Sequence, residues 1–323
     1  MELPLELLNA IENEAKSISI NKLASLVSSI SKRYRDERPS STNKFLNEHE
    51  EIIAYIVYRI PATYGAIYTV LNHVKEIYSD FHPKSLLDVG AGPGPAMWAA
   101  TAIWGDINKI TLIERDENMI NIGKKLSSKS THDPIKNANW VKMDLNSLFE
   151  ITKHDIVIAS YSIGELIEEA RQKVIKKLWE STNDILIIIE PGTKNGFSRI
   201  KKARETLLSL GAYSIAPCPH DKECPITDDN WCHFSSRIQR TSLHRRVKNG
   251  QLPYEDEKFS YICVSKSPHN NINSRIIRHP QIRKGHIIIE LCTKEGLKQV
   301  TITKSDRDRY KKVRNLKWGS TFE

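Results

Sequence analysis

No apolar run in this 323-residue sequence approaches the ~20 residues that a membrane-spanning helix needs. The first residues, MELPLELLNAIENEAKS, lack the basic start and small-residue cleavage site of a secretory signal, and they lack the Arg/Ser bias of a transit peptide. Internal repeats and low-complexity linkers are missing as well. We therefore expect a cytoplasmic protein with no membrane partner.

Cysteine is scarce and unevenly placed. Five cysteines are an odd number, which argues against a disulfide framework, and clustered thiols in a reducing compartment more often bind metal. Three of them lie in the proline-rich segment APCPHDKECPITDDNWCHF, at spacings looser than the C-x2-C pairs of zinc ribbons. Three clustered thiols and a distant fourth suit tetrahedral zinc or an iron–sulfur cluster, while His220 and His233 keep a mixed Cys/His zinc site open. The candidate ligands are Cys218, Cys224, Cys232 and Cys292.

The fifth cysteine, Cys263, lies inside the apolar strand pattern YICV. A free cysteine in such a setting behaves as a small hydrophobic residue. We expect Cys263 to be a buried core thiol and not a metal ligand.

The apolar periodicity changes near residue 85. Before it, segments such as EHEEIIAYIVYRI have helical spacing, and Pro61 is expected to end one helix and begin the next. After it, SLLDVG, KITLIER, NWVKMDL, HDIVIASYS and DILIIIEP read as strands that alternate with helices, which is typical of a doubly wound parallel sheet. KFSYICVSK predicts one more strand, and GHIIIELCTKEGLKQVTITK predicts a hairpin that turns at 294–296.

A glycine loop, LLDVGAGPGPA, follows the first predicted strand. Glycines allow positive φ and let a ligand approach the backbone closely. A dinucleotide fingerprint would need its third glycine at position 95, where the chain has a proline without an N–H for a phosphate. The loop and its preceding aspartate instead resemble motif I of the S-adenosylmethionine-dependent methyltransferases.

Acidic residues at strand ends extend this resemblance. Glu114 ends the second predicted strand, where an acidic residue can accept both ribose hydroxyls, and Asp144 ends the third, where it can meet the adenine amine. The predicted cofactor-binding residues are Asp88, Gly90, Gly92, Gly94, Glu114 and Asp144.

No methyltransferase catalytic motif follows the fourth predicted strand. The segment ASYSIGE has no evident base or nucleophile, although Tyr161 and Glu165 are candidates. Methyl transfer from a sulfonium needs mainly alignment of donor and acceptor, so the missing motif argues against catalysis without deciding the question. The catalytic residues stay unassigned.

Positive charge is concentrated in the last quarter of the chain. Residues 237–323 contain 20 Lys/Arg and 8 Asp/Glu, a net charge of +12, whereas residues 1–236 contain 28 and 31, a net charge of −3. This asymmetry favours a nucleic-acid partner over the alternative of a solvated basic face. Because 237–246 closely follow Cys232, a metal centre would be expected to position them. The candidate phosphate contacts are Arg237, Arg240, Arg245, Arg246, Arg278, Arg283 and Lys284.

Several segments together resemble a known family: EHEEIIAYIVYRIPATYGAIYTVL, LLDVGAGPGPAMWAA, EPGTKNGFSRI, APCPH, WCHFSSRIQRTSLHR and YEDEKFSY. They are similar to the methyltransferase-like proteins of the mitochondrial small ribosomal subunit and their bacterial relatives, over about residues 30–320. The resemblance implies a small-subunit assembly factor that binds rRNA, with uncertain methyl transfer. It also implies a 4Fe–4S cluster on Cys218, Cys224, Cys232 and Cys292, with zinc as the alternative.

We therefore predict an α/β, class I S-adenosylmethionine-dependent methyltransferase (Rossmann-like) fold. A helical N-terminal region at 1–80 would precede a methyltransferase-like domain at 81–266 with a cysteine-rich, metal-binding insertion at 214–250. A basic C-terminal β-hairpin and tail would occupy 267–323. The leading hypothesis is a monomeric S-adenosylmethionine-binding, iron–sulfur factor that binds small-subunit rRNA and assembly intermediates. The alternatives are an active rRNA methyltransferase and, less favoured, a methyltransferase acting on protein or a small molecule.

Overall fold

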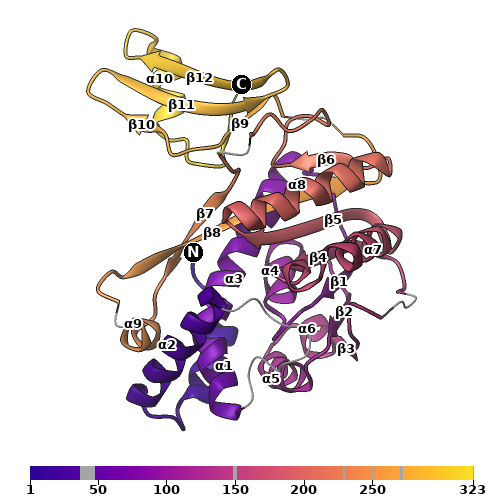
Figure 1. The fold of residues 1–323 in the computed structure, drawn as a ribbon. Coiled ribbons are helices and arrows are strands. Elements are labelled where there is room, and N and C mark those ends of the chain that lie inside the picture. The colour runs from indigo at the N-terminus through magenta and orange to yellow at the C-terminus, as the bar shows by residue number, and fades with distance from the viewer. Residues whose placement is uncertain (37–47, 148–150, 228–229, 249, 270–271, 323) are drawn as a thin grey trace.

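The computed structural model of the chain describes residues 1–36, 48–147, 151–227, 230–248, 250–269 and 272–322. Each of the three predicted regions includes a few residues outside these ranges. A large sheet with helices on both faces makes up most of the molecule, and a smaller sheet lies at one end of it (Figure 1). No helix in the described part of the chain has the length and apolar character to cross a membrane.

The large sheet has the strand order β3-β2-β1-β4-β5-β8-β6. Strands β1 to β5 are parallel, while β8 runs antiparallel to both β5 and β6. This is the topology of the class I methyltransferase fold, so the predicted fold class is confirmed. The strands are β1 (Ser85–Val89), β2 (Lys109–Glu114), β3 (Asn139–Lys142), β4 (His154–Ser160), β5 (Thr182–Pro191), β6 (Tyr213–Ala216) and β8 (Tyr254–Ser265).

Both faces of this sheet are apolar because helices cover both. Alternate residues of β1 and β4 face opposite ways: Leu86 and Ile158 join one hydrophobic cluster, and Leu87 joins the other. The first face is covered by α3 (His49–Ile77), α4 (Pro95–Ile103) and α5 (Glu117–Ser127), with α1 (Leu5–Ala15), α2 (Ile20–Asp36) and the short α6 (Asp133–Lys136) around them. The second face is covered by α7 (Glu168–Glu180) and α8 (Lys194–Ser209).

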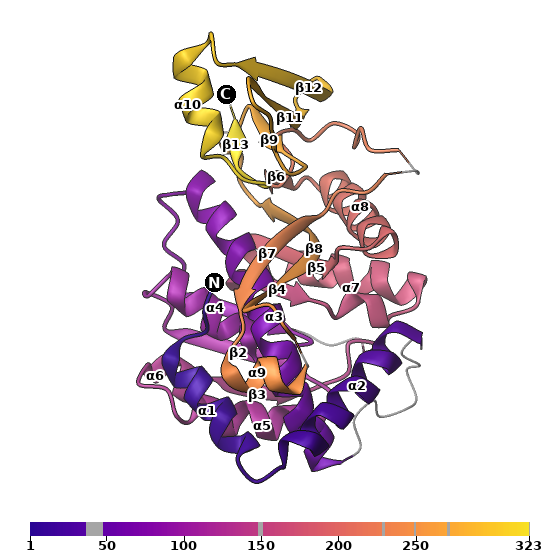
Figure 2. The same ribbon diagram turned by 90° about the vertical axis from the view of Figure 1, so that its left-hand side faces the viewer.

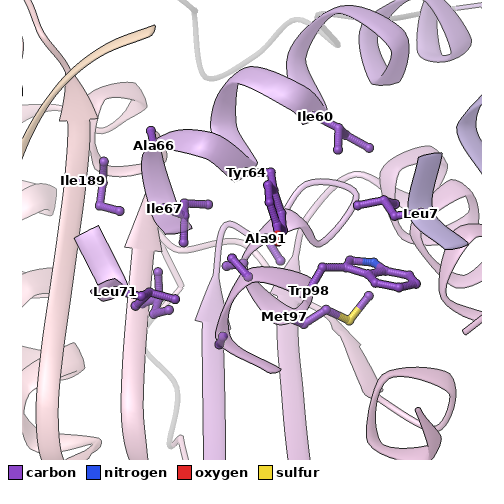
Figure 3. Close-up of a cluster of buried hydrophobic side chains, with 14 of the residues drawn as sticks. Leu7, Ile60, Tyr64, Ala66, Ile67, Leu71, Ala91, Met97, Trp98 and Ile189 are labelled. Atoms are coloured by element: carbon purple, nitrogen blue, oxygen red, sulfur yellow. The ribbon is translucent and has the colours of Figure 1, made fainter. Parts of the chain in front are cut away.

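Pro61 does not end a helix, contrary to the sequence-based expectation. Helix α3 continues through it from residue 49 to 77. Proline removes one backbone hydrogen bond from a helix interior, but this helix is buried on the first face of the sheet, and packing of that face offsets the loss. Figure 3 shows part of this packing, in which Tyr64 of α3 points toward Ala91 of the glycine loop.

A strand that the sequence did not predict extends the sheet. Strand β7 (Phe234–Gln239) pairs with the first half of β8, which begins at Tyr254, before the predicted strand. Helix α9 (Ser242–Val247) joins the two strands. This β7–β8 arm carries α9 away from the small sheet and against α2 (Figures 1 and 2).

The C-terminal segment forms a second sheet of five strands, ordered β10-β11-β9-β13, with β12 paired to β11. The predicted hairpin is confirmed by the pairing of Thr293 with Gly296. The predicted tail instead folds back as a helix and an edge strand over a core that includes Ile287, Ile302 and Val313. The elements are β9 (Ser274–Ile276), β10 (Gln281–Ile282), β11 (His286–Thr293), β12 (Gly296–Thr303), α10 (Arg307–Arg314) and β13 (Thr321–Phe322).

Candidate functional site

The glycine loop connects β1 to α4 at the carboxyl edge of the large sheet. Gly90, Gly92 and Gly94 have φ values of 69°, 53° and 82°, a region that L-residues with side chains rarely adopt. A Cβ atom built on Gly92 would meet nothing within 4 Å, so the loop faces open space at its middle. Gly94 precedes Pro95 at the first turn of α4. The predicted strand–loop–helix context of motif I is therefore present.

Asp88 lies beneath this loop and is fully buried. Neither of its carboxylate oxygens has a hydrogen-bond partner among the described residues. Burial, reinforced by the nearby charge of Glu114, raises the pKa of Asp88 from its ordinary 3.8 to about 8. A buried acid without a partner is costly, so Asp88 is a group that a donor on a bound ligand would stabilise.

Glu114, at the end of β2, holds the glycine loop. Its Oε2 atom accepts the N–H of Gly92 at 2.8 Å, and its Oε1 atom accepts the N–H groups of Arg115 and Asp116 at 2.8 and 2.9 Å. A carboxylate has about four accepting positions, and three are thus occupied. One accepting position remains, and the predicted role of Glu114 toward the ribose hydroxyls stays a prediction.

Asp144 follows β3, the neighbour of β2 in the sheet. Its Oδ1 atom accepts the backbone N–H and the side-chain amide of Asn146 at 2.8 and 2.9 Å, which leaves the second oxygen available. In the parallel pairing of β2 with β3, Glu114 lies opposite Lys142, two residues before Asp144. Glu114 and Asp144 therefore lie at the same edge of the sheet. These positions agree with an adenosine site, and the assignment of the residues to a cofactor stays a prediction.

The two catalytic candidates are engaged elsewhere. Tyr161 donates its hydroxyl to Glu257 at 3.2 Å, and burial with the Glu257 charge raises the pKa of Tyr161 well above its ordinary value. Glu165 forms an ion pair with Arg115 at 3.0 Å. Neither arrangement is that of a free general base.

The four candidate thiols surround one cavity between α8, the loop after β6 and the C-terminal sheet. The cavity has an empty volume of about 530 Å³, part of it open to solvent, and its walls include Phe197, Ile226 and Ile277. The cysteines that line it are Cys218, Cys224, Cys232 and Cys292. Residues 74 positions apart in the sequence, Cys218 and Cys292, are thus brought together. Cys263 is fully buried in β8 and does not line the cavity, so its prediction as a core thiol is confirmed.

The thiols are close enough to influence one another. Burial raises the pKa of Cys232 well above its ordinary value, and the charges of the other three cysteines add to the rise. Burial and the charges of Cys218 and Cys224 raise the pKa of Cys292 to about 12.

The four cysteines do not make a ready coordination group. Within the described ranges, no three His, Cys, Asp or Glu side chains are placed to hold a metal ion. The Nε2 atom of His220 lies 3.9 Å from the Cys292 sulfur. The donor chemistry fits a thiolate-bound centre, because all four cysteines line one cavity and a bound metal deprotonates a coordinating thiol. The metal ligands stay a prediction.

The structure divides the predicted phosphate contacts. Arg237 and Arg240 form ion pairs with Asp256 and Glu255 at 2.8 and 3.0 Å. Arg278 donates to the carbonyl groups of Ile277 and Trp231, beside the cysteine loop. Arg237 is nevertheless exposed. The other exposed members of the predicted set are Arg245 and Arg246 on α9, and Arg283 and Lys284 between β10 and β11.

Two aspects of the basic surface were not foreseen. Helix α10 exposes Arg307, Lys311 and Arg314, which the sequence reasoning left out because it treated the segment as a tail; their i, i+4 and i, i+3 spacing is the signal that could have found them. The β7–β8 arm also carries α9 away from the C-terminal sheet, whose strand β11 contains Cys292 (Figure 2). The expectation that a metal centre positions all of 237–246 is therefore not supported by the fold.

Strand order, glycine loop and acidic strand ends together define a protein of the class I methyltransferase fold. More narrowly, the chain belongs to the family described as mitochondrial small ribosomal subunit Rsm22, whose model matches residues 49–323. This finding confirms the family resemblance.

Relatives of known name are consistent with that family. The human mitochondrial ribosome assembly protein METTL17 is 26% identical over 285 residues, which cover 83% of this chain and 61% of the relative. The Rsm22-cox11 tandem protein 2 of Schizosaccharomyces pombe is 28% identical, over 84% of this chain and 43% of the relative. The ribosome assembly protein RSM22 of Saccharomyces cerevisiae is 21% identical, over 100% of this chain and 74% of the relative. The chain thus spans less than two thirds of the first two.

Solved structures resemble the chain more weakly. Magnesium protoporphyrin IX methyltransferase from Synechocystis has a TM-score of 0.42 and 12% identity, covering 73% of this chain and 91% of that one. The N-methyltransferase NodS from Bradyrhizobium japonicum has a TM-score of 0.39 and 11% identity, covering 62% and 94%. The fold assignment stands on the strand order of the chain itself.

The expectation of a cytoplasmic protein is wrong. The relatives from human, fission yeast and budding yeast are mitochondrial proteins by name. The expectation rested on a missing targeting signal in the first residues, and an absence of that kind does not decide the compartment.

Proposed function

We propose that this protein is a small-subunit assembly factor that binds rRNA, with S-adenosylmethionine at the carboxyl edge of the large sheet and a 4Fe–4S cluster at the four cysteines. Its relatives are ribosome assembly proteins by name. In this proposal both groups serve to shape the protein for rRNA binding, and no step of chemistry on the rRNA is required.

The observation that carries the proposal is the cavity lined by all four cysteines. Cys218, Cys224 and Cys232 come from the segment between β6 and β7, while Cys292 comes from β11 of the C-terminal sheet. A centre bound there would join the methyltransferase-like part to the basic C-terminal part. When bound, an iron–sulfur cluster supplies a covalent cross-link and an electron-transfer couple. The protein supplies four thiols, apolar walls and nearby arginines.

The proposed nucleotide site uses the chain's own groups in separate ways. Glu114 has one accepting position for a ribose hydroxyl, and Asp144 has a free oxygen for the adenine amine. The orphaned carboxyl group of Asp88 would interact favourably with the positive charge of the ligand.

The rRNA surface is assigned to exposed cations at the two ends of the molecule. Arg245 and Arg246 lie on α9 at the end of the β7–β8 arm, and α10 carries Arg307, Lys311 and Arg314 on the C-terminal sheet. Contacts of this kind go to phosphates and position a protein on RNA without reading sequence.

Two measurements on anaerobically purified protein test the cofactor part. Iron, sulfide and zinc analysis is expected to give four irons and four sulfides per chain, as the stoichiometry of the proposed cluster requires; one zinc without iron would refute the cluster. Calorimetry is expected to show S-adenosylmethionine binding that Glu114→Gln weakens by about 1.5–3 kcal/mol, the worth of one hydrogen bond to a charged group. Unchanged affinity in a folded Glu114→Gln protein would place the ribose elsewhere.

Co-sedimentation with small-subunit precursors tests the rRNA part. Binding is expected to weaken steeply with salt because counterions are released from phosphates. The protein should still bind precursor rRNA from which the ribosomal proteins have been removed. If removal of the ribosomal proteins abolishes binding, the protein recognises them and not the rRNA.

An active rRNA methyltransferase remains the second candidate, favoured by the open backbone around Gly92. Radiolabelled S-adenosylmethionine and rRNA from a deletion strain separate the two proposals. If the protein is a scaffold, it binds rRNA from the deletion strain and transfers no label to it. If the protein is an enzyme, it labels this rRNA stoichiometrically and does not label wild-type rRNA, which is already methylated.

A further inference from the structure

Two arginines are buried beside the cysteine cavity. Arg204 on α8 is 3% exposed and lines the cavity, and Arg275 on β9 is fully buried. Arg275 is the register partner of Cys292 across the β9–β11 pair, so the two side chains lie on the same face of the small sheet. Its Nε atom donates to the carbonyl oxygen of Pro217, the neighbour of Cys218, at 2.9 Å. Both arginines therefore contact the segments that carry the thiols.

Neither guanidinium group has a carboxylate partner. No ion pair joins Arg204 or Arg275 to an acidic residue anywhere in the described part of the chain. The acceptors they have are neutral carbonyl groups: Arg204 donates to His220 and Lys222 at 2.8 and 2.7 Å, and Arg275 also donates to Gly319 at 2.6 Å. Buried charges are costly unless they are paired with an opposite charge.

Each arginine also has an unused donor. The Nε atom of Arg204 and the Nη2 atom of Arg275 are buried without an acceptor among the described residues. Buried donors of this kind are rare in native proteins and call for a specific explanation. A missing anion would account for the unused donors and for the unpaired charges together.

The groups near both arginines that can become anions are the thiols. Arg275 donates to the carbonyl group next to Cys218 and is the register partner of Cys292. Arg204 donates to His220 and Lys222, which lie in the loop between Cys218 and Cys224. Four thiolates around a doubly positive iron–sulfur core, or around zinc, carry two net negative charges. The two guanidinium charges match such a dianion.

We propose that Arg204 and Arg275 are the buried counter-charges of a dianionic tetrathiolate centre in this cavity. The inference rests on the metal centre in the proposed function and adds the residues that balance its charge. Both arginines are positioning residues and not ligands. Reduction of an iron–sulfur cluster adds one more negative charge, which nearby cations favour. The arginines therefore raise the reduction potential of the cluster.

The experiment compares Arg204→Gln and Arg275→Gln with Arg204→Lys and Arg275→Lys in the cluster-bound protein. Arg171→Gln on α7 is the control, because Arg171 is 9% exposed and α7 does not line the cavity. Arg171 donates to the carbonyl groups of Ile163 and Leu166 and is paired with Glu168, so it is a buried arginine that already has its counter-charge. Spectroelectrochemical titration measures the potential. In each Gln variant, the ratio of reduced to oxidised cluster at a fixed applied potential is expected to fall at least tenfold. This change corresponds to a reduction potential lower by about 59 mV for a one-electron couple. The Lys variants and the control are expected to remain near the wild-type value.

Every outcome of this comparison decides the inference. Gln variants that keep the cluster at the wild-type potential would overturn it. If the Gln variants do not take up the cluster, the Lys variants decide. A cluster at the wild-type potential in the Lys variants supports charge compensation. Lys variants that do not take up the cluster would assign the arginines a hydrogen-bonding role instead. Wild-type protein with zinc and no iron would refute the proposed cluster alone. In that case the measurement becomes the rate at which each protein loses zinc to a chelator, in place of the reduction potential. If the Gln variants keep zinc as well as the Arg171→Gln control does, the proposed charge match is overturned.

Discussion

At the scale of single residues, Asp88 shows most clearly that a group suited to ligand binding can cost folding stability. Its carboxyl group is buried without a partner, and burial with the charge of Glu114 raises its pKa to about 8. A raised pKa means that the folded state binds more protons than the unfolded state between the two pKa values. The stability contributed by the neutral carboxyl group is therefore full below pH 4 and is lost as pH rises toward 8.

We expect Asp88→Asn to remove this pH dependence. Between pH 5 and 8, the free energy of unfolding of the wild type should fall relative to the variant, by at most about 1.4 kcal/mol per pH unit. Urea denaturation at several pH values measures the difference. Asp155→Asn is the control: burial opposes ionisation of Asp155, but hydrogen bonds from Lys84 and Ser85 lower its pKa, so this pair should show no slope in that range. A flat difference for Asp88→Asn would mean that the carboxyl group is solvated or paired in solution.

Two buried cysteines make a matched test of the proposed cluster. Cys292 is 8% exposed and lines the cavity, whereas Cys263 is fully buried in the main sheet, away from it. We expect Cys292→Ser to abolish the visible absorption and bound iron. Cys263→Ser should retain both and lose about 1–3 kcal/mol of stability, because a hydroxyl group is buried in an apolar site. Bleaching by Cys263→Ser alone would reverse the ligand assignment.

The sequence predicted the residues of the site better than their contacts. The glycines and Glu114 were predicted as cofactor-binding residues because the loop motif and the strand ends leave a local signal, and the four cysteines, predicted as metal ligands, do line one cavity. Their roles stay predictions. The engagement of Glu114 by three backbone N–H groups has no such signal, since it depends on the exact path of the loop. Arg204 and Arg275 were missed because a buried arginine is indistinguishable in sequence from a solvated one until the fold places it beside the thiols.

At the scale of elements, alternating strands and helices predicted the main sheet because each βα unit is local in sequence. Strand β7 was missed because its pattern, FSSRIQ, is short and polar on one side, and it is stabilised by pairing with a distant part of β8. Pro61 was misread because a proline breaks a helix only when the lost hydrogen bond is not offset, and here the helix is buried along the sheet. Tertiary packing decided both cases.

The two basic helices allow a prediction about rRNA binding. We expect Arg245→Glu/Arg246→Glu on α9 and Arg307→Glu/Lys311→Glu on α10 each to weaken binding to small-subunit precursors. Each lost phosphate contact should also reduce the slope of log affinity against log salt by roughly 0.7 to 0.9. Lys173→Glu/Lys176→Glu on α7 is the matched control, with the same change in charge at exposed positions on another helix. Equal losses from all three pairs would show that net charge alone, and not these surfaces, drives binding.

At the scale of the whole molecule, the C-terminal sheet is joined to the large sheet around the cysteine cavity. The hydrophobic core of the small sheet is limited to a few side chains such as Ile287, Ile289 and Val313. A unit of this size is marginal by itself, because small domains bury too little of their surface. The contacts of Arg278 with the carbonyl group of Trp231 in the cysteine loop and of Arg275 with Pro217 hold it against the segment that follows β6. A centre that binds Cys292 together with the other three cysteines would add the strongest of these links.

Removal of the metal should therefore loosen one end of the protein and leave the other intact. After chelation under anaerobic conditions, we expect amide hydrogen exchange to accelerate in β11 and β12 and to stay slow in β1, β4 and β5, whose pairing does not involve the cavity. Binding of rRNA through α10 should weaken, while binding through α9 should persist, because the β7–β8 arm places α9 against α2. Hydrogen exchange that accelerates equally in both sheets would mean that the molecule unfolds as one unit, and unchanged exchange in β11 would show that the centre does not hold the C-terminal sheet.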